Sequence, residues 1–372
     1  KDSIRIPYPK EFVGRDKVKS LLAELNQAET AMNFEIVINL GERILKIDRQ
    51  HKTACTKTAL AYQQRILNYY NQGKYNEVIE NCDRAIILKP DFADFYYQRA
   101  KVYYQQKDWE KVIENCNHAL KLKKESDYYW KRGLAYCEIA NYDQAILDAE
   151  NSMKNLSDTK AEYYYLYGRS LYTKAVSIAY PQAVESIIYI PHRRFYAPMS
   201  FINPQQIEKM NPLFRKAIDA LNKAINKKSS KIASYYWVRG LCYLAQGNNN
   251  SAIDDFNYAH KLSPNQTNYD YNYLVGISYQ AKGDQNSAIY YFTVALAIGI
   301  LNNSSKDGYY YCRSLSYYNR GNSWLQNAAQ GTPNNDDILA LEDINKAIQI
   351  NPLNLAYFTL KGWIEIRMSG GR

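Results

Sequence analysis

Two segments, "SDYYWKRGLAYC" (126–137) and "ASYYWVRGLCYL" (233–244), share an aromatic triplet, a basic residue and a glycine at the same offsets. Around them, small or apolar residues recur with a steady spacing: Ile66, Ala100, Gly133 and Gly168 are 34, 33 and 35 residues apart. Self-similarity at a fixed period is typical of repeat architectures, in which a single unit cannot bury its apolar face and stacking creates the core.

A second recurring feature is an apolar rhythm with helical spacing. The segments 75–92, 251–266 and 339–354 carry apolar residues at i, i+3 or i+4, and i+7, and each is closed by a proline or a polar turn. This pattern predicts amphipathic helices. Each repeat is therefore predicted to contain two helices, A and B, joined by a turn such as "IANYD" (139–143) or "AQGNN" (245–249).

The unit 233–266 resembles the tetratricopeptide repeat. When each unit is numbered so that its glycine is the eighth residue, this unit matches the family's pattern at Tyr236, Gly240, Tyr243, Ala252, Phe256, Ala259 and Pro264. The family's pattern has leucine at the seventh position, but this unit and four others have arginine there. The residues are Arg65, Arg99, Arg132, Arg239 and Arg320. The resemblance implies an all-α fold, a right-handed superhelical α-solenoid of about eight helix-turn-helix units.

We expect one solenoid over residues 18–368, preceded by a leader (1–17) and followed by a short tail (369–372). The predicted units are 18–51 (degenerate), 59–92, 93–125, 126–159, 161–229 (interrupted by an insertion at 177–210), 233–266, 269–302 and 314–354, with a capping helix at 355–368. Because the chain begins at Lys1 rather than at a methionine, we expect it to be part of a longer protein.

Composition and motifs favour a non-catalytic protein. The six cysteines form no C-x-x-C pair and there are only four histidines, so we expect no metal site and buried, reduced thiols, as in a cytoplasmic protein. Phosphate-binding loops and hydrolase motifs are missing, so we expect no cofactor, no catalytic residue and no enzymatic activity. No apolar run reaches the length that spans a bilayer, about 18 residues, so we expect no membrane insertion.

The aromatic residues divide into two sets by repeat position. Rings at the fourth position should pack between helices A and B of one unit, as core residues. These residues are Tyr62, Tyr96, Tyr129, Tyr164, Tyr236, Tyr317 and Phe358. The resemblance implies that the fifth position points into an open groove, flanked by the ninth and twelfth positions. The candidate partner-binding residues are Tyr97, Lys101, Trp130, Tyr165, Arg169, Trp237, Leu241, Leu244, Tyr273, Ile277 and Tyr318.

The groove is expected to change character along its length. Lys101, Lys131 and Arg169 make its first half cationic, whereas Trp237 and its neighbours make the second half a neutral apolar trough. The insertion at 177–210 is rich in aromatic and aliphatic residues, so we expect it to pack on the solenoid. Within it, His192, Arg193 and Arg194 are candidates for contact with an anionic group, and Phe195 is a further candidate site residue of the insertion.

These features predict a protein-interaction scaffold or adaptor that binds a peptide segment or a partner helix. The net charge of +10 and the groove aromatics leave open an alternative, a helical-repeat protein that binds single-stranded RNA. A third possibility is the sensor or regulatory portion of a larger signalling protein. The oligomeric state and the partner's identity are left open.

Overall fold

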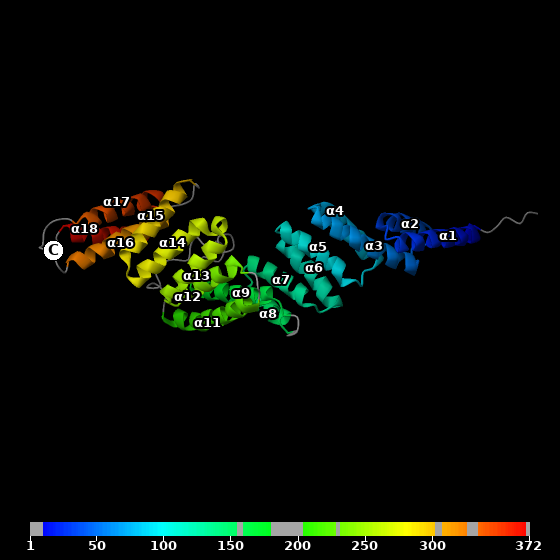
Figure 1. Cartoon of the computed structure of the whole chain (residues 1–372), viewed down its shortest axis with the longest axis horizontal. Helices are drawn as coiled ribbons and strands as arrows, with labels where there is room; N and C mark the ends of the chain where they lie inside the picture. Colours follow the sequence, from blue (N-terminus) through cyan, green and yellow to red (C-terminus); the bar gives the residue numbers. More distant parts are fainter. Residues whose placement is uncertain are drawn as a thin grey trace, which may run out of the picture. The chain divides into compact units, whose positions relative to one another are not determined.

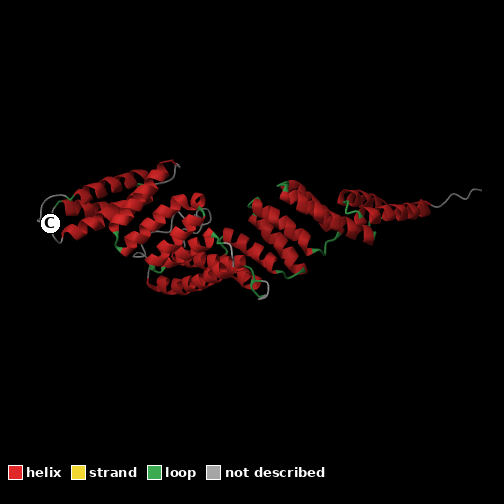
Figure 2. Ribbon diagram, in the orientation of Figure 1, coloured by secondary structure: helices red, strands yellow, loops and turns green. Residues whose placement is uncertain are grey.

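The computed structural model describes residues 10–154, 159–179, 204–227, 231–301, 307–325 and 334–369. Throughout these residues the regular structure is α-helical (Figures 1 and 2). The chain divides into two compact units, 1–159 and 160–372. The helices of the first unit are α1 (Lys10–Thr30), α2 (Phe34–Ile47), α3 (Lys52–Asn71), α4 (Tyr75–Leu88), α5 (Ala93–Gln105), α6 (Trp109–Leu122), α7 (Ser126–Glu138) and α8 (Tyr142–Ser152).

The second unit has the same construction. Its helices are α9 (Ala161–Ala179), α11 (Pro204–Lys227), α12 (Ala233–Ala245), α13 (Asn249–Leu262), α14 (Pro264–Lys282), α15 (Gln285–Leu301), α16 (Asp307–Leu325), α17 (Asn335–Ile350) and α18 (Leu355–Met368). Within each unit, consecutive helices pack in pairs, and each pair packs on the next. The prediction of an all-α solenoid built from helix pairs is confirmed. That the two units continue as one solenoid stays a prediction.

Several predicted boundaries can be compared with the helices. Helix α1 begins at Lys10, inside the predicted leader, and α3 begins at Lys52, ahead of the predicted unit start at 59. The two ends of the predicted insertion belong to α9 and α11, and residues 180–203 lie outside the described residues. His192, Arg193, Arg194 and Phe195 are among these, so their role stays a prediction.

Short turns join helix A to helix B within each pair. Several of these turns contain a residue with positive φ. Gly73, Gly247 and Gly283 have φ of 72°, 76° and 91°. Two residues that are not glycine, Lys107 and Ala140, have φ of 60° and 59°. A residue in the left-handed region ends a helix and reverses the chain. The sequence signal for these turns is therefore more than glycine alone.

The glycine of the eighth position lets helix B approach helix A closely. A Cβ atom added at Gly240 would lie 2.8 Å from Cε1 of Phe256, and one added at Gly276 would lie 2.7 Å from Cε1 of Phe292. Both phenylalanines are completely buried. The glycine of helix A and the aromatic ring of helix B thus form one packing unit, repeated in the pairs α12–α13 and α14–α15.

In three of the five units that carry it, the arginine of the seventh position pairs with an aspartate sixteen residues later, on helix B of the same helix pair; Arg99 instead donates to Asn115, and Arg65 to Glu35 on α2. Arg239 donates from Nε to Oδ2 of Asp255 (2.8 Å) and from Nη2 to Oδ1 (2.7 Å). The same two-bond arrangement joins Arg132 to Asp148, at 2.8 and 2.7 Å. A third example, Arg320 with Asp336, has bonds of 2.9 and 2.6 Å. In each of these three arginine–aspartate ion pairs the carboxylate is buried.

The same guanidinium groups also reach the preceding pair. Nη1 of Arg239 donates to Oδ1 of Asn222 on α11 (2.7 Å), and Nη1 of Arg132 donates to Asn117 on α6. Nη1 of Arg320 donates to Oδ1 of Asn286 on α15 (2.8 Å). Each of these arginines therefore holds three helices together, and we call the arrangement the arginine clamp.

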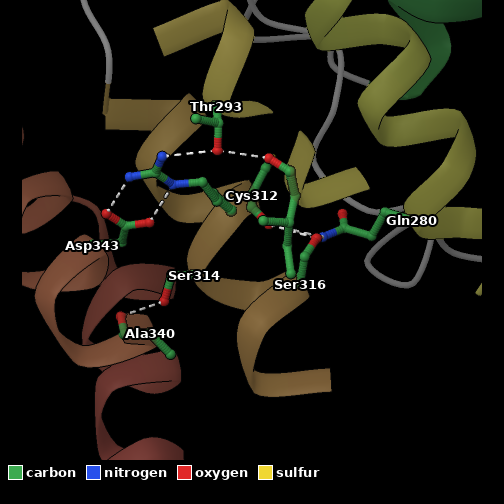
Figure 3. Close-up of polar contacts among 9 residues, drawn as sticks. Gln280, Thr293, Cys312, Ser314, Ser316, Ala340 and Asp343 are labelled. Carbon is green, nitrogen blue, oxygen red and sulfur yellow. Dashed lines mark hydrogen bonds and ion pairs between the residues drawn. The ribbon is translucent and has the colours of Figure 1, made fainter. Parts of the chain in front are cut away.

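Helix α16 carries a second clamp arginine, two turns closer to its start. Arg313 donates to both carboxylate oxygens of Asp343 on α17 (2.6 and 2.9 Å) and to the hydroxyl of Thr293 on α15 (3.0 Å). Figure 3 shows Asp343 and Thr293 on either side of this guanidinium. Nearby, the Gln280 amide of α14 donates to the Ser316 hydroxyl (2.7 Å) and links α14 to α16.

Candidate functional site

The rings of the fourth position are less buried than predicted. Tyr62 is buried, as expected, but Tyr96, Tyr129, Tyr164, Tyr236 and Tyr317 are only half-buried and Phe358 is exposed. The guanidinium of Arg239 lies 5.3 Å from the Tyr236 ring centre, and that of Arg320 lies 5.4 Å from Tyr317. Because arginine replaces leucine one turn later, these rings cover a cation by cation–π contact. Tyr96 and Tyr236 face helix B of their own pair as predicted, against His118 (5.3 Å) and Tyr258 (4.6 Å), but outside Tyr62 these rings are not fully buried.

The fifth-position residues of the second unit do not line an open trough. Trp237 is 5% exposed and packs on Phe256, with the ring centres 5.3 Å apart. Tyr273 is 8% exposed and packs on Phe292 (6.0 Å) and Tyr309 (4.6 Å). The physical reason is the packing unit described above: Gly240 and Gly276 admit a ring from helix B, and the fifth-position ring lies against it.

The residues predicted to flank that trough are also buried, wholly or in part. Leu241 and Leu244 are buried, and Ile277 is half-buried. The expectation that Trp237, Leu241, Leu244 and Tyr273 are open to a partner is therefore wrong. Tyr165 and Tyr318 are half-buried and engaged with other side chains: Tyr165 stacks on Tyr235 (4.8 Å), and the Arg367 guanidinium lies 3.8 Å from the Tyr318 ring. Arg169 is also half-buried.

The cationic first half of the predicted groove corresponds to a defined set of contacts in the first unit. Nζ of Lys101 on α5 lies 4.5 Å from the ring centre of Tyr70 on α3. Nζ of Lys131 on α7 lies 4.3 Å from Tyr104 on α5 and 4.5 Å from Trp130. These five residues cross three successive A helices, and we call them the lysine–aromatic strip. Tyr97, also on α5, packs on Tyr128 next to the strip (4.7 Å).

Lys131 is the most unusual member of the strip because it is a buried ammonium group. It is 8% exposed, and within the described residues of the first unit neither Lys131 nor Lys101 has a carboxylate oxygen within salt-bridge distance. Burial, together with the positive charge of Lys101, lowers the pKa of Lys131 to about 8. Burial also lowers the pKa of Lys101. The strip thus holds two cations that cost free energy to bury.

Two carboxylates near the strip moderate this charge without neutralising it. The charges of Asp94 and Asp127 partly offset the lowering of the Lys101 pKa. The Asp94 carboxylate accepts a hydrogen bond from the hydroxyl of Tyr128, whose pKa is raised by burial and by this bond. The repeat positions predicted Lys101, Trp130 and Tyr97 as binding residues, but not Tyr70. Tyr70 stands at the twelfth position, as Tyr104 does, and that register could have identified it.

The thiols do not supply an alternative chemistry. Five of the six cysteines are buried and the sixth, Cys55, is half-buried. Burial raises the pKa of Cys82 and Cys116 to about 12, which suppresses the nucleophilic thiolate. Among the described residues, no cluster of histidine, cysteine, aspartate or glutamate has the geometry of a metal site, and no helix is long and apolar enough to cross a membrane.

Comparison with known families agrees with the helix-pair architecture. A family model described as a TPR repeat matches residues 67–107, and one described as a tetratricopeptide repeat matches residues 213–267. Two segments of the chain, one in the first unit and one in the second, are therefore tetratricopeptide repeats. No match is found among curated proteins.

Solved structures of similar fold come from several sources. PilF of Pseudomonas aeruginosa is 13% identical, with 72% of this chain and 99% of that chain covered and a TM-score of 0.48. MamA of Desulfovibrio magneticus RS-1 is 15% identical over 56% and 96%, with a TM-score of 0.41. Human IFIT1, a dimer with m7Gppp-AAAA, is 16% identical over 91% and 65%, with a TM-score of 0.45.

The packing of Trp237 leads to a test by substitution. Trp237→Ala should lower the free energy of unfolding by roughly 3–5 kcal/mol, because a large ring leaves the contact with Phe256. Tyr236→Ala should cost roughly 1–2 kcal/mol, because it removes a half-buried ring that covers Arg239. Urea unfolding of the two variants would measure both values. Equal losses, or a greater loss for Tyr236→Ala, would contradict the packing described.

The burial of Lys131 predicts a pH-dependent stability. The unfolded lysine titrates at about 10.4, and burial lowers the folded pKa to about 8. The unfolded state therefore holds more protons between these values, so stability should rise as pH rises through this window. Lys131→Met should raise the free energy of unfolding by about 2 kcal/mol near pH 7, and the gain should shrink toward pH 10.

The control for this test is Lys121→Met, on the exposed face of α6. It should leave the unfolding midpoint almost unchanged at both pH values. A Lys131→Met variant that is less stable than the parent at pH 7 would show that the ammonium group has a stabilising partner.

Proposed function

We propose that this chain is a non-catalytic protein-interaction scaffold, and that the lysine–aromatic strip binds a partner segment that carries carboxylate groups. The observation that supports it is the pair of cations on adjacent A helices, Lys101 and Lys131, each held against aromatic rings. A cytoplasmic location and a role as an adaptor are part of the same proposal.

Electrostatics supports an anionic ligand. Burying an ammonium group without a counter-ion is unfavourable, and a carboxylate that enters the strip would form the missing charge-assisted hydrogen bonds. Lys131 is buried beside a second cation, Lys101, which further disfavours its charged form. A partner's carboxylate would relieve both costs at once. Part of the binding free energy would then come from removing the desolvation penalty that the two ammonium groups carry in the unbound chain.

The aromatic rings supply the second part of the recognition. Tyr70, Tyr104 and Trp130 are half-buried, so part of each ring surface is open to the outside of the helices. Tyrosine and tryptophan are enriched at the centres of protein interfaces because they contribute large contact area at low conformational cost. An extended segment that places a carboxylate at the lysines could lay apolar side chains against these rings.

Single-stranded RNA is the second candidate ligand. The net charge of +10 favours it, as do cations that alternate with aromatic rings on which bases could stack. Against it, a groove that follows a phosphate backbone needs a continuous cationic line. The equivalent rings Trp237 and Tyr273 of the second unit are buried and cannot stack on bases. The protein-binding proposal is therefore the stronger one, and a sensor role in a longer protein is compatible with it.

Selection from a random peptide library displayed on phage would test the proposal. Peptides that bind the chain should carry aspartate or glutamate, and their affinity should fall at least about tenfold, or about 1.4 kcal/mol, for the double variant Lys101→Met, Lys131→Met. Methionine keeps the unbranched side chain and removes only the charge. The matched control is Lys121→Met together with Lys124→Met, both exposed, which should leave the affinity unchanged.

Two outcomes would contradict the proposal. Selected peptides without acidic residues, bound equally by the parent and the double variant, would place the binding site elsewhere. Tight binding of a single-stranded RNA oligonucleotide that weakens steeply with salt and is lost in the double variant would make RNA the ligand of the strip.

A further inference from the structure

The two lysines of the lysine–aromatic strip stand at different repeat positions but make the same contact. Lys101 is at the ninth position of α5, and Lys131 is at the sixth position of α7. Nζ of Lys101 lies 4.5 Å from the ring centre of Tyr70, and Nζ of Lys131 lies 4.3 Å from that of Tyr104. Both rings belong to the twelfth position of the preceding helix A. The strip therefore presents one cation–ring pair twice, at successive repeats.

The distance between the two cation–ring pairs is set by the packing of the A helices. Helix α3 contacts α5, and α5 contacts α7. Packed helices have axes about 8–10 Å apart, so rings at equivalent positions of α3 and α5 are separated by a similar distance. The charge of Lys101 adds to burial in lowering the pKa of Lys131, as expected for neighbouring cations. A ligand that meets both cations must therefore carry two anionic groups about 8–10 Å apart.

Backbone geometry decides which kind of segment meets this spacing. In polyproline II, three residues complete a turn and each advances about 3.1 Å, so side chains i and i+3 lie on one side, about 9 Å apart. In a β-strand, the side chains on one side are two or four residues apart, at about 7 Å or about 13 Å. An α-helix matches the spacing with residues i and i+7, about 10.5 Å apart. Polyproline II and the α-helix are thus the two candidates.

The composition of the strip favours polyproline II over the helix. Tyr70, Tyr104 and Trp130 are half-buried, and an ammonium group lies over each ring. An amphipathic helix binds by burying an apolar face in a hydrophobic groove, which these cation-bearing rings do not form. Proline-rich segments dock on surfaces lined with aromatic rings, and they lose little entropy because their conformation is preformed.

We infer that the strip binds a proline-rich segment in the polyproline II conformation, with acidic residues at i and i+3, as in Glu-Pro-Pro-Glu. The inference rests on the proposed function of the strip and adds the conformation and the charge spacing of its ligand. One carboxylate meets Lys101 beside Tyr70, and the other meets Lys131 beside Tyr104. The prolines between them lie against the rings.

Three labelled peptides of identical composition test the spacing. Each contains two glutamates and three prolines between glycine–serine ends, in the order EPEPP, EPPEP or EPPPE, so that the carboxylates are two, three or four residues apart. Fluorescence anisotropy with the full chain should show that EPPEP binds at least about fivefold tighter than the other two, the effect of one additional ion pair. The reason is that only EPPEP presents both carboxylates to the two cations at once.

Single variants of the chain test whether the preference comes from the two lysines. Lys101→Met removes one cation and keeps the unbranched side chain, so it should lower the affinity for EPPEP to that of the other two peptides. Lys131→Met should have the same effect. The matched control is Lys121→Met, at an exposed position of α6, which should leave the preference for EPPEP unchanged. Circular dichroism would verify that the variants fold.

The contrary outcomes separate this inference from the proposed function. Equal binding of the three peptides, lost in the double variant Lys101→Met, Lys131→Met, would overturn the spacing and leave the binding of acidic segments intact. A helical peptide with glutamates at i and i+7 that binds more tightly than EPPEP would overturn the polyproline II conformation. If none of the three peptides binds, the inference is also wrong, and the phage selection decides separately whether the strip binds acidic segments of another pattern.

Discussion

The arginine clamp is the polar interaction that joins successive helix pairs in this chain, at Arg132, Arg239 and Arg320. A leucine at the seventh position would pack against helix B without fixing its direction, because dispersion contacts are not directional. A guanidinium has five donors in a planar fork, and its buried bonds must all be satisfied. Arg239 uses three of these donors, two on Asp255 of its own helix B and one on Asn222 of the preceding one. Only one relative arrangement of the three helices completes the set.

The clamp acts through specificity more than through net stability. Burial raises the pKa of Asp148 and Asp255, and the arginine partners only partly offset it. The desolvation of each carboxylate therefore outweighs much of its attraction to the guanidinium, as is common for buried ion pairs. What the pair contributes is geometry: the fourth-position tyrosines cover the cation, and the fifth-position side chains turn toward the neighbouring helices. In the first unit this geometry aligns Tyr70, Lys101 and Lys131 across α3, α5 and α7.

The fold could be predicted from the sequence because its determinants are local. Helical spacing, the period of the small residues and the turns each act within one repeat, and they predicted the helix pairs. Exposure could not be predicted in the same way, because it depends on residues in a different helix. Trp237 was expected to be open, yet Gly240 admits Phe256 and the two rings pack together. Lys131 appeared to be a surface cation, and it is buried because Tyr104 and Trp130 enclose its ammonium group.

The coupling free energy between Arg239 and Asn222 tests most directly whether the clamp joins successive pairs. A double-mutant cycle with Arg239→Met, Asn222→Ala and the combined variant isolates this one contact from the bond to Asp255. The arginine clamp predicts a coupling of about 1.5 kcal/mol or more, as for a buried hydrogen bond to a charged group. Additive effects, with a coupling below about 0.3 kcal/mol, would show that the guanidinium holds only its own helix pair, and that packing alone sets the stack.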